Sequence, residues 1–468
     1  MNSHKIIRAI LYAFGAQLLS LVLSVLLSLA IPKILNVEQY GYWQLFIFYT
    51  GYVGIFHFGF IDGIYLRLGG CRYDDLNFPL LGKELRIFIL SQIVIAVGMI
   101  IAGIILINDF ERSLIIIMTA IYLPIVNISN YFGYIFQSVN KTQLYSFSVM
   151  TDKICALIGV VILLLFKCPS VIPYCLVYIL GRIICLVYCV WNGRNLIITS
   201  CIFSRSVLKD MFENISAGIK LMISNLVSML IIGSGRMVID QIWGIETFGK
   251  FSMAISLINF TLQFISQVSM VLFPTLRVVN QDKLHEVFQT GQRYLGLILS
   301  FGLVLYFPIR IFMYYWLPDY YESMIYLAVL MPICIFDGKM NVLCTTYFKV
   351  IREEKKLMII NVISLLSSFV LSLIGGYIAQ NMEIIVFGMV LTIIVRSVVS
   401  ETVLSKIMHI SISLNTWIEI ILSIVFVGCA SILDVKVGFF IYCLCYLTYL
   451  CVNYRSIRSA ISRINTPL

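Results

Sequence analysis

Nine ionisable side chains within or beside otherwise strongly apolar stretches of the chain are the candidates for chemistry. They are Arg182, Arg396, Lys339, Arg236, Arg310, His57, Asp62, Asp337 and Asp240. An ionisable group in hydrocarbon is costly unless it is paired or wetted, so each marks a candidate functional position. The basic groups favour an anion such as a diphosphate, because an arginine fork binds phosphate oxygens at two points. The three aspartates are candidates for carrying a proton or a sodium ion.

The basic members of this set outnumber the acidic ones, so a cavity shared by them would be net positive. That charge favours a diphosphate or acidic sugars over a cationic drug. Arg182, Arg396 and Lys339 lie deepest in their segments, which favours a cavity-lining role for these three. For these three, an Asp337–Lys339 pair or a pair between helices is the alternative. Structural pairing at short spacing is the alternative for Arg236 with Asp240 and for Asp62 with Arg67. Arg310 could also extend past Pro308 toward water.

The elements that carry these groups are membrane-spanning helices. Of 468 residues, 60% are apolar and 12% are charged, and the charged share is about half that of a soluble domain. This composition excludes a soluble enzyme, a nucleic-acid-binding protein and a disordered scaffold. Fourteen apolar segments are long enough to span a bilayer as helices: 9–31, 42–66, 87–107, 113–136, 147–166, 171–191, 215–239, 251–273, 294–316, 324–348, 357–379, 384–405, 416–433 and 437–454.

The basic residues outside the deep positions predict the orientation of these segments. With a cytoplasmic N-terminus, 23 lysines and arginines fall on the cytoplasmic side and five on the outside. This asymmetry agrees with the positive-inside rule. We therefore expect both termini in the cytoplasm, and most of the net charge of +10 reflects orientation.

Loop lengths predict two lobes joined by a cytoplasmic connection. The longest connection, 192–214, includes an amphipathic stretch, Ile197 to Met211, that suits a helix on the membrane surface. It would separate an N-terminal lobe, 1–191, from a C-terminal lobe, 215–406, which is followed by two further helices and a basic tail, 407–468. The cysteines lie mostly within spans, the four histidines are scattered, and a Gly-rich lysine motif for nucleotides is missing. No metal or cofactor is expected.

The two halves also resemble each other at a nearly constant offset. Glu38–Gly41 corresponds to Glu246–Gly249 and Ala120–Pro124 to Ala328–Pro332, both 208 positions later. Arg67 ends the second segment much as Arg277 ends the eighth. Six spans per copy predict a parallel repeat about an axis along the membrane normal. Two such bundles can enclose a cavity that opens to either face, which is the geometry of a transporter.

Several motifs carry a resemblance to a known family. They are Pro32, Glu38–Trp43, Gly59–Ile64 followed by Arg67, and Phe273–Arg277. With its span count and half-size, the chain resembles the polysaccharide-exporter branch of the multidrug/oligosaccharidyl-lipid/polysaccharide (MOP) superfamily, and more narrowly bacterial O-antigen flippases of the Wzx type. The resemblance implies a V-shaped pair of six-helix lobes in the bacterial inner membrane. It also implies transfer of an undecaprenyl-diphosphate-linked oligosaccharide to the outer leaflet, beside a polysaccharide polymerase and chain-length machinery.

The sequence thus predicts an all-α polytopic membrane protein that acts as a flippase by alternating access and is not an enzyme. An antiporter of drugs or cations in the same superfamily is the first alternative. A membrane glycan polymerase is less favoured, because it would need a substantial outside loop with catalytic arginine or histidine. The outside loops here reach only about ten residues.

Overall fold

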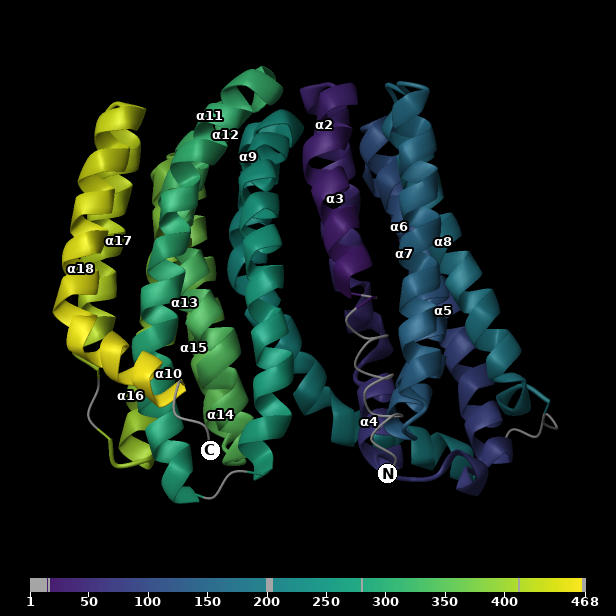
Figure 1. Cartoon of the computed structure of the whole chain (residues 1–468). Helices are drawn as coiled ribbons and strands as arrows, with labels where there is room; N and C mark the ends of the chain where they lie inside the picture. Colours follow the sequence, from purple (N-terminus) through teal and green to yellow (C-terminus); the bar gives the residue numbers. More distant parts are fainter. Residues whose placement is uncertain (1–14, 16, 199–204, 279–280, 411–412, 465–468) are drawn as a thin grey trace. The chain divides into compact units, whose positions relative to one another are not determined.

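The computed structural model describes residues 15, 17–198, 205–278, 281–410 and 413–464, and omits the side chains at 205, 267–278, 281–283 and 455–464. Within these residues the secondary structure is helical, which confirms the predicted all-α membrane class (Figure 1). Residues 9–14 of the first predicted segment, and the side chains of the Phe273–Arg277 motif, lie outside the described residues.

The chain forms two compact units, Met1–Leu226 and Val227–Leu468. Unit 1 holds the following helices, with short helical turns between some of them: η1 (Leu26–Ala30), α2 (Ile31–Ile34), α3 (Val37–Tyr52), η2 (Val53–His57), α4 (Phe60–Leu68), η3 (Tyr73–Asp75), α5 (Phe78–Leu106), α6 (Phe110–Ser138), α7 (Thr142–Leu165), α8 (Val171–Asn192), η4 (Arg194–Leu196) and the first part of α9 (Arg205–Val278).

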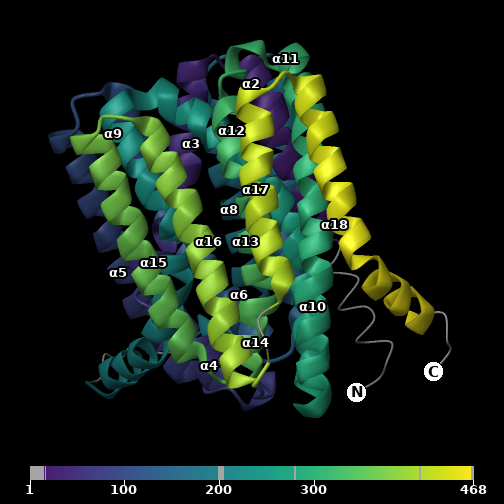
Figure 2. The same ribbon diagram turned by 90° about the vertical axis from the view of Figure 1, so that its left-hand side faces the viewer.

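Unit 2 begins within α9 and continues to the end of the described chain. Its further helices are α10 (Gln281–Gly302), η5 (Leu303–Leu305), α11 (Tyr306–Trp316), η6 (Pro318–Tyr320), α12 (Ser323–Leu330), α13 (Ile333–Lys339), η7 (Met340–Cys344), α14 (Thr345–Val350), α15 (Glu354–Leu373), η8 (Ile374–Ile378), α16 (Met382–Ile407), α17 (Leu414–Ile432) and α18 (Val435–Ile464). Figure 2 shows α15, α16, α17 and α18 side by side in this unit.

Eleven helices among the described residues are long and apolar enough to cross a membrane, and thirteen if each of two bent pairs is one span. One of the eleven, Ser206–Ser266, has 61 residues, or about 90 Å of helix against a hydrocarbon core of about 30 Å. It has non-helical backbone at Gly244 (φ 78°). This stretch contains the predicted segment 215–239 and most of 251–273, which explains why eleven helices accommodate more than eleven predicted segments.

The long helices expose apolar side chains and bury aromatic ones. Leu106, Phe166 and Ile432 are more than three-quarters exposed, which suits lipid rather than water. Inside unit 1 the rings of Phe60 and Tyr131 are stacked 6.0 Å apart. Unit 2 has a buried core of its own, which includes Phe288 and Tyr347.

The second predicted span is broken where it carries candidate residues. The helix pair Val37–His57 and Phe60–Leu68 bends by 62°. Phe58 and Gly59 both adopt positive φ at the bend, 50° and 81°. The bend ends one helix at His57 and starts α4 just before Asp62, which brings these two side chains together.

The start of α9 packs on α4 through three glycines, Gly59, Gly63 and Gly218, which we call the glycine contact. A Cβ at Gly63 would collide with the Asn214 carbonyl, and one at Gly218 with the Gly59 carbonyl. Small residues four apart allow this approach of two helices in a membrane. Of the predicted surface helix Ile197–Met211, residues 199–204 lie outside the described residues, and 205 onward forms this part of α9. The division between the units thus falls inside α9.

Gly63→Ala is expected to destabilise unit 1 by about 1–3 kcal/mol, because the new methyl group meets backbone that cannot turn aside. The measurement is thermal unfolding of the purified protein in detergent. Gly98→Ala in α5 is the matched control, since a Cβ there meets no atom within 4 Å. Equal unfolding temperatures for the two variants would show that α9 does not rest on the glycine contact.

Candidate functional site

In unit 1 the structure places Arg182 in a cluster with Asp152, Lys153 and Tyr122, which we call the Arg182 cluster. Arg182 Nε on α8 lies 3.4 Å from Asp152 Oδ2 on α7 and donates a hydrogen bond to the Tyr122 hydroxyl at 3.1 Å. Lys153 Nζ lies 3.4 Å from the same Asp152 oxygen. Gly181 allows the approach, because a Cβ there would lie 3.0 Å from the Asp152 carbonyl. Two cations thus share one carboxylate.

The cations of this cluster are more accessible than their carboxylate. The side chains of Arg182 and Lys153 are 19% and 18% exposed, and that of Asp152 is 4% exposed. Both cations therefore retain a surface that a ligand could contact, within helices expected to cross the membrane. A formal charge of +1 remains in the cluster, so an anion is the favoured ligand.

Half-buried tyrosines lie near the Arg182 cluster. Tyr145 on α7 is within electrostatic range of Arg182. It also contacts Gly133 on α6, where a Cβ would lie 3.3 Å from the Tyr145 ring. Tyr134 on the same helix packs edge-on against Tyr65, with ring centroids 5.7 Å apart. Rings of this kind, apolar on their faces and polar at one end, suit sugar rings as well as ordinary packing.

The structure brings His57 and Asp62 together at the bend before α4. His57 Nε2 lies 3.8 Å from Asp62 Oδ2, and His57 Nδ1 accepts a hydrogen bond from the Gly59 amide at 3.1 Å. Because Nδ1 is an acceptor, the ring proton is assigned to Nε2, facing the carboxylate. The two side chains are 11% and 9% exposed.

The alternative pairing of Asp62 with Arg67 is wrong. Arg67 Nη2 instead lies 3.1 Å from Glu84 Oε2 on α5, and Glu84 Oε1 accepts from Asn214 Nδ2 on α9 at 3.0 Å. Arg67 is five residues beyond Asp62 on α4, but its guanidinium lies closer to Glu84, a fully buried carboxylate on α5. Glu84 thereby joins α4, α5 and the start of α9.

In unit 2 Arg396 on α16 is buried at the meeting point of three other helices. Its Nε donates to Asn361 Oδ1 on α15 at 2.9 Å, and its Nη2 donates to Ser228 Oγ on α9 at 2.9 Å. Its Nη1 lies 3.2 Å from Asp337 Oδ1 on α13. Asp337 also accepts from Asn341 at 3.1 Å. All three nitrogens of the guanidinium thus donate to protein groups.

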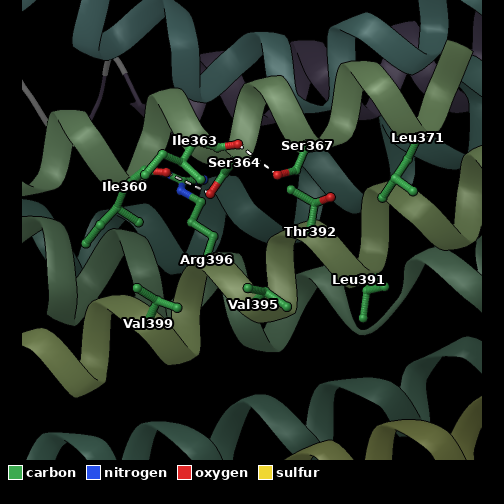
Figure 3. Close-up of a pocket in the computed structure, with 10 residues that line it drawn as sticks. All are labelled: Ile360, Ile363, Ser364, Ser367, Leu371, Leu391, Thr392, Val395, Arg396 and Val399. Carbon is green, nitrogen blue, oxygen red and sulfur yellow. Dashed lines mark hydrogen bonds between the residues drawn. The ribbon is translucent and has the colours of Figure 1, made fainter.

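A groove of about 220 Å³ lies between α15 and α16, with Arg396 in its wall (Figure 3). Its polar lining is limited, because the Ser364, Ser367 and Thr392 hydroxyls each donate to a carbonyl of their own helix at 2.8–2.9 Å. Ile363 and the other aliphatic side chains cover the rest. The groove therefore suits a hydrocarbon chain better than a phosphate.

Lys339 forms a second buried cluster in unit 2, with Glu401 on α16 and Glu419 on α17, which we call the lysine cluster. Its Nζ lies 2.7 Å from Glu401 Oε1 and 2.8 Å from Glu419 Oε2, and none of the three side chains is more than 1% exposed. Thr416 donates to Glu401 at 2.7 Å. The alternative pairing of Lys339 with Asp337 is wrong, since two residues apart on a helix they point to different faces.

The remaining candidates lie elsewhere in unit 2. Arg236 Nη2 donates to Ser252 Oγ at 2.9 Å, and its guanidinium lies 5.1 Å from the Phe248 ring centroid. Arg310 Nη1 donates to the Ala430 carbonyl at 2.8 Å, which ties α11 to α17. Asp240 is buried on α9. Within each unit, the candidates therefore lie in separate clusters.

Of the carboxylates that meet the deep cations, Asp337 is among the candidates predicted from the sequence, but Asp152, Glu401 and Glu419 are not. Asp152 was visible as an interruption of segment 147–166. Glu401 and Glu419 lie close to the ends of segments 384–405 and 416–433 and were not singled out. When these partners are counted, the formal charge of the Arg182 cluster is positive, whereas that of the lysine cluster is not. Within the described residues, no group of three or more metal-ligating side chains is placed to hold an ion.

Searches with family models and against curated proteins returned no match. Solved structures do match. A structure described as the lipid II flippase MurJ in an inward closed conformation aligns over 96% of this chain and 99% of its own, with a TM-score of 0.67 and 15% identity. An inward-facing multidrug resistance MATE family transporter of the MOP superfamily aligns over 82% and 94%, with a TM-score of 0.59 and 13% identity.

A further MATE structure, in complex with MaD5, aligns over 86% of this chain and 96% of its own, with a TM-score of 0.54 and 13% identity. At these identities the likeness concerns the fold, and it extends over nearly the whole chain. The chain therefore has the fold of the MOP superfamily transporters.

Proposed function

We propose that this protein is a flippase for a lipid-linked oligosaccharide, with undecaprenyl diphosphate as the lipid carrier, working by alternating access in a bacterial inner membrane. The observation that carries the proposal is the Arg182 cluster. Two partly exposed cations share one carboxylate within membrane helices, and half-buried tyrosines lie near them. Arg182 and Lys153 would contact the diphosphate, and Tyr145 and Tyr134 would face the sugars.

Two further observations support this assignment. A lipid-linked substrate also needs an apolar surface, and the groove between α15 and α16 offers one within unit 2. The structure with a TM-score of 0.67 is described as a flippase for lipid II. We further propose that both termini are cytoplasmic, from the distribution of basic residues in the sequence.

A cation antiporter is the second candidate, because the lysine cluster has more carboxylates than cations. Its side chains are at most 1% exposed, however, so an organic cation has no surface to contact there. The accessible charge in the Arg182 cluster is positive. That polarity favours an anionic substrate.

The gene's deletion in its host tests the function. Loss of surface polymer, with single lipid-linked repeat units retained on the cytoplasmic leaflet, is the result expected of a flippase. Units that reach the outer leaflet unpolymerised would indicate a polymerase instead. An unchanged glycan with new sensitivity to cationic drugs would indicate the antiporter.

Complementation with Arg182→Gln tests the site. Loss of a charge-assisted contact of about 1.5–3 kcal/mol predicts roughly a 10- to 100-fold slower transfer. Asp152 keeps Lys153 as a partner, so the fold should tolerate the change. Arg182→Lys retains the charge and should restore part of the activity. Lys355→Gln, on an exposed side chain of α15, is the control. Wild-type transfer by Arg182→Gln would remove the cluster from the substrate path.

A further inference from the structure

The lysine cluster carries more negative than positive charge. Lys339 is one cation between two carboxylates, Glu401 and Glu419, and all three side chains are excluded from solvent. If all three were ionised, a net charge of −1 would be buried at the junction of α13, α16 and α17. An uncompensated buried charge is strongly unfavourable. The junction therefore requires a further positive charge when both carboxylates are ionised.

The described neighbours do not supply that charge. On α17 Thr416 is neutral, and on α18 the Tyr449 hydroxyl donates to Glu419 Oε1 at 3.3 Å. On η7, Cys344 is close enough to interact electrostatically with Lys339, Glu401 and Arg396, but it brings no positive charge. On α16, Arg396 is already balanced by its own carboxylate, Asp337, and the Lys406 side chain is exposed.

On α10 the nearest residue is a glycine, Gly296, and a Cβ there would collide with Glu419 Oε1. The fold therefore leaves space for this carboxylate where any other side chain would displace it. Gly296 thus faces an oxygen of Glu419 and supplies no positive charge.

A second feature of α16 points to what the cluster binds. Ser397 and Ser405 lie one turn before and one turn after Glu401, on the same helical face. Both are 1% exposed, and neither hydroxyl has a hydrogen-bond partner among the described residues. Buried hydroxyls normally have a partner, and water is the usual one when protein groups are not in reach.

Ser405 lies near the end of α16 at Ile407. Four residues of helix separate Ser405 from Glu401, a rise of about 6 Å. With one buried water on each side, a hydroxyl at this place can accept a proton from the helix end and pass one on toward the carboxylates.

We propose that the lysine cluster is a proton-binding site, filled and emptied along the hydroxyl face of α16. Binding forms one O–H bond on the carboxylate pair, shared between Glu401 and Glu419, and breaks one O–H bond of the donor. Ser405 gives up its proton to a water between it and the carboxylates, which passes one of its own to the pair, and Ser405 regains a proton from water at the helix end. The bound proton neutralises the cluster, and its release restores the charge of −1.

Proton binding at this cluster is independent of the substrate. Its coupling to transport rests on the proposed function, because a charge change at the junction of α13, α16 and α17 alters the packing of unit 2. The test below uses no substrate, so its failure would leave the flippase proposal intact.

The test is infrared difference spectroscopy of the purified full-length protein in lipid vesicles, alternated between acidic and alkaline buffer, in H2O and D2O. The wild type should show the carbonyl band of one protonated buried carboxylic acid, shifted in D2O. Glu401→Gln and Glu419→Gln should each lose it, because either change leaves Lys339 balanced by a single carboxylate. Glu84→Gln, which removes a carboxylate already paired with Arg67, should retain it.

A wild-type spectrum without the band, or a band that persists in both glutamine variants, would overturn the proposal. Ser405→Ala tests the path without altering any charge, and should slow the growth of the band after a jump to acidic buffer. Ser367→Ala is its control, since that hydroxyl is exposed and donates to its own helix. Equal rates in the two alanine variants would overturn the path along α16.

Discussion

Replacing Lys339 by methionine is expected to lower the free energy of unfolding by about 3–5 kcal/mol, because it leaves two carboxylates buried without their cation. The Lys339 side chain is 0% exposed, and its Nζ lies within 2.8 Å of an oxygen of each glutamate. Methionine fills a similar volume, so the loss reports the charge and not a cavity. Chemical unfolding of the purified protein in detergent measures it.

Lys250→Met is the matched control for this prediction. Lys250 Nζ lies 2.6 Å from Glu322 Oε2, but the two side chains are 23% and 66% exposed. An exposed ion pair contributes about 0–1 kcal/mol. Both lysines lie at a similar distance from their carboxylates, so the two substitutions differ in the burial of the ion pair. The comparison therefore separates the effect of burial from that of pairing. Similar losses at the two lysines would contradict the prediction.

A compensated variant completes the comparison. Adding Glu401→Gln and Glu419→Gln to Lys339→Met removes all three charges together. Most of the lost stability should return, because no charge then lies uncompensated in the unit. Absence of any recovery would assign the loss to packing around Lys339.

The helices and the membrane class follow from the sequence because they depend on local information. Long apolar runs must form helices in lipid, whichever partners they later meet. The 61-residue helical stretch was predicted as two segments for the same reason: a single span cannot use that length. Such patterns need no knowledge of tertiary packing.

The ion pairs could not be predicted in this way, since their members are far apart in the chain. Lys339 and Glu419 are separated by 80 residues, and Arg396 and Asp337 by 59. Short spacing offers Asp337 as an alternative partner of Lys339, but helix geometry does not support contact at that spacing. The pairing is decided by which helices pack together.

The partners of Arg67 show the same limit at closer range. Arg67 is five residues from Asp62, yet its carboxylate is Glu84 on α5. Glu84 is fully buried because the glycine contact brings α9 and Asn214 against the same place. Glu84 lies before the predicted segment 87–107 and would be taken for a loop residue. Only the packing of α4, α5 and α9 shows that it is part of the core.

Replacing Arg396 by lysine is expected to keep the positive charge at this position but to lose part of the hydrogen bonding of the guanidinium. The guanidinium reaches three helices at once, through Asn361, Asp337 and Ser228. An ammonium is a compact point charge that keeps the pairing with Asp337 but cannot span all three acceptors. Interhelical hydrogen bonds in membranes average about 0.6 kcal/mol, so losing two of them predicts a loss of about 1 kcal/mol.

Arg396→Met should cost more, about 3 kcal/mol, because Asp337 then keeps its charge in a site that is 16% exposed. Adding Asp337→Asn should recover most of that loss in unfolding measurements. Because all three nitrogens already donate to protein groups, the lysine variant should transfer substrate at a rate within a few-fold of wild type. A folded lysine variant that fails to transfer would instead give Arg396 a direct role in binding the substrate, beside the Arg182 cluster.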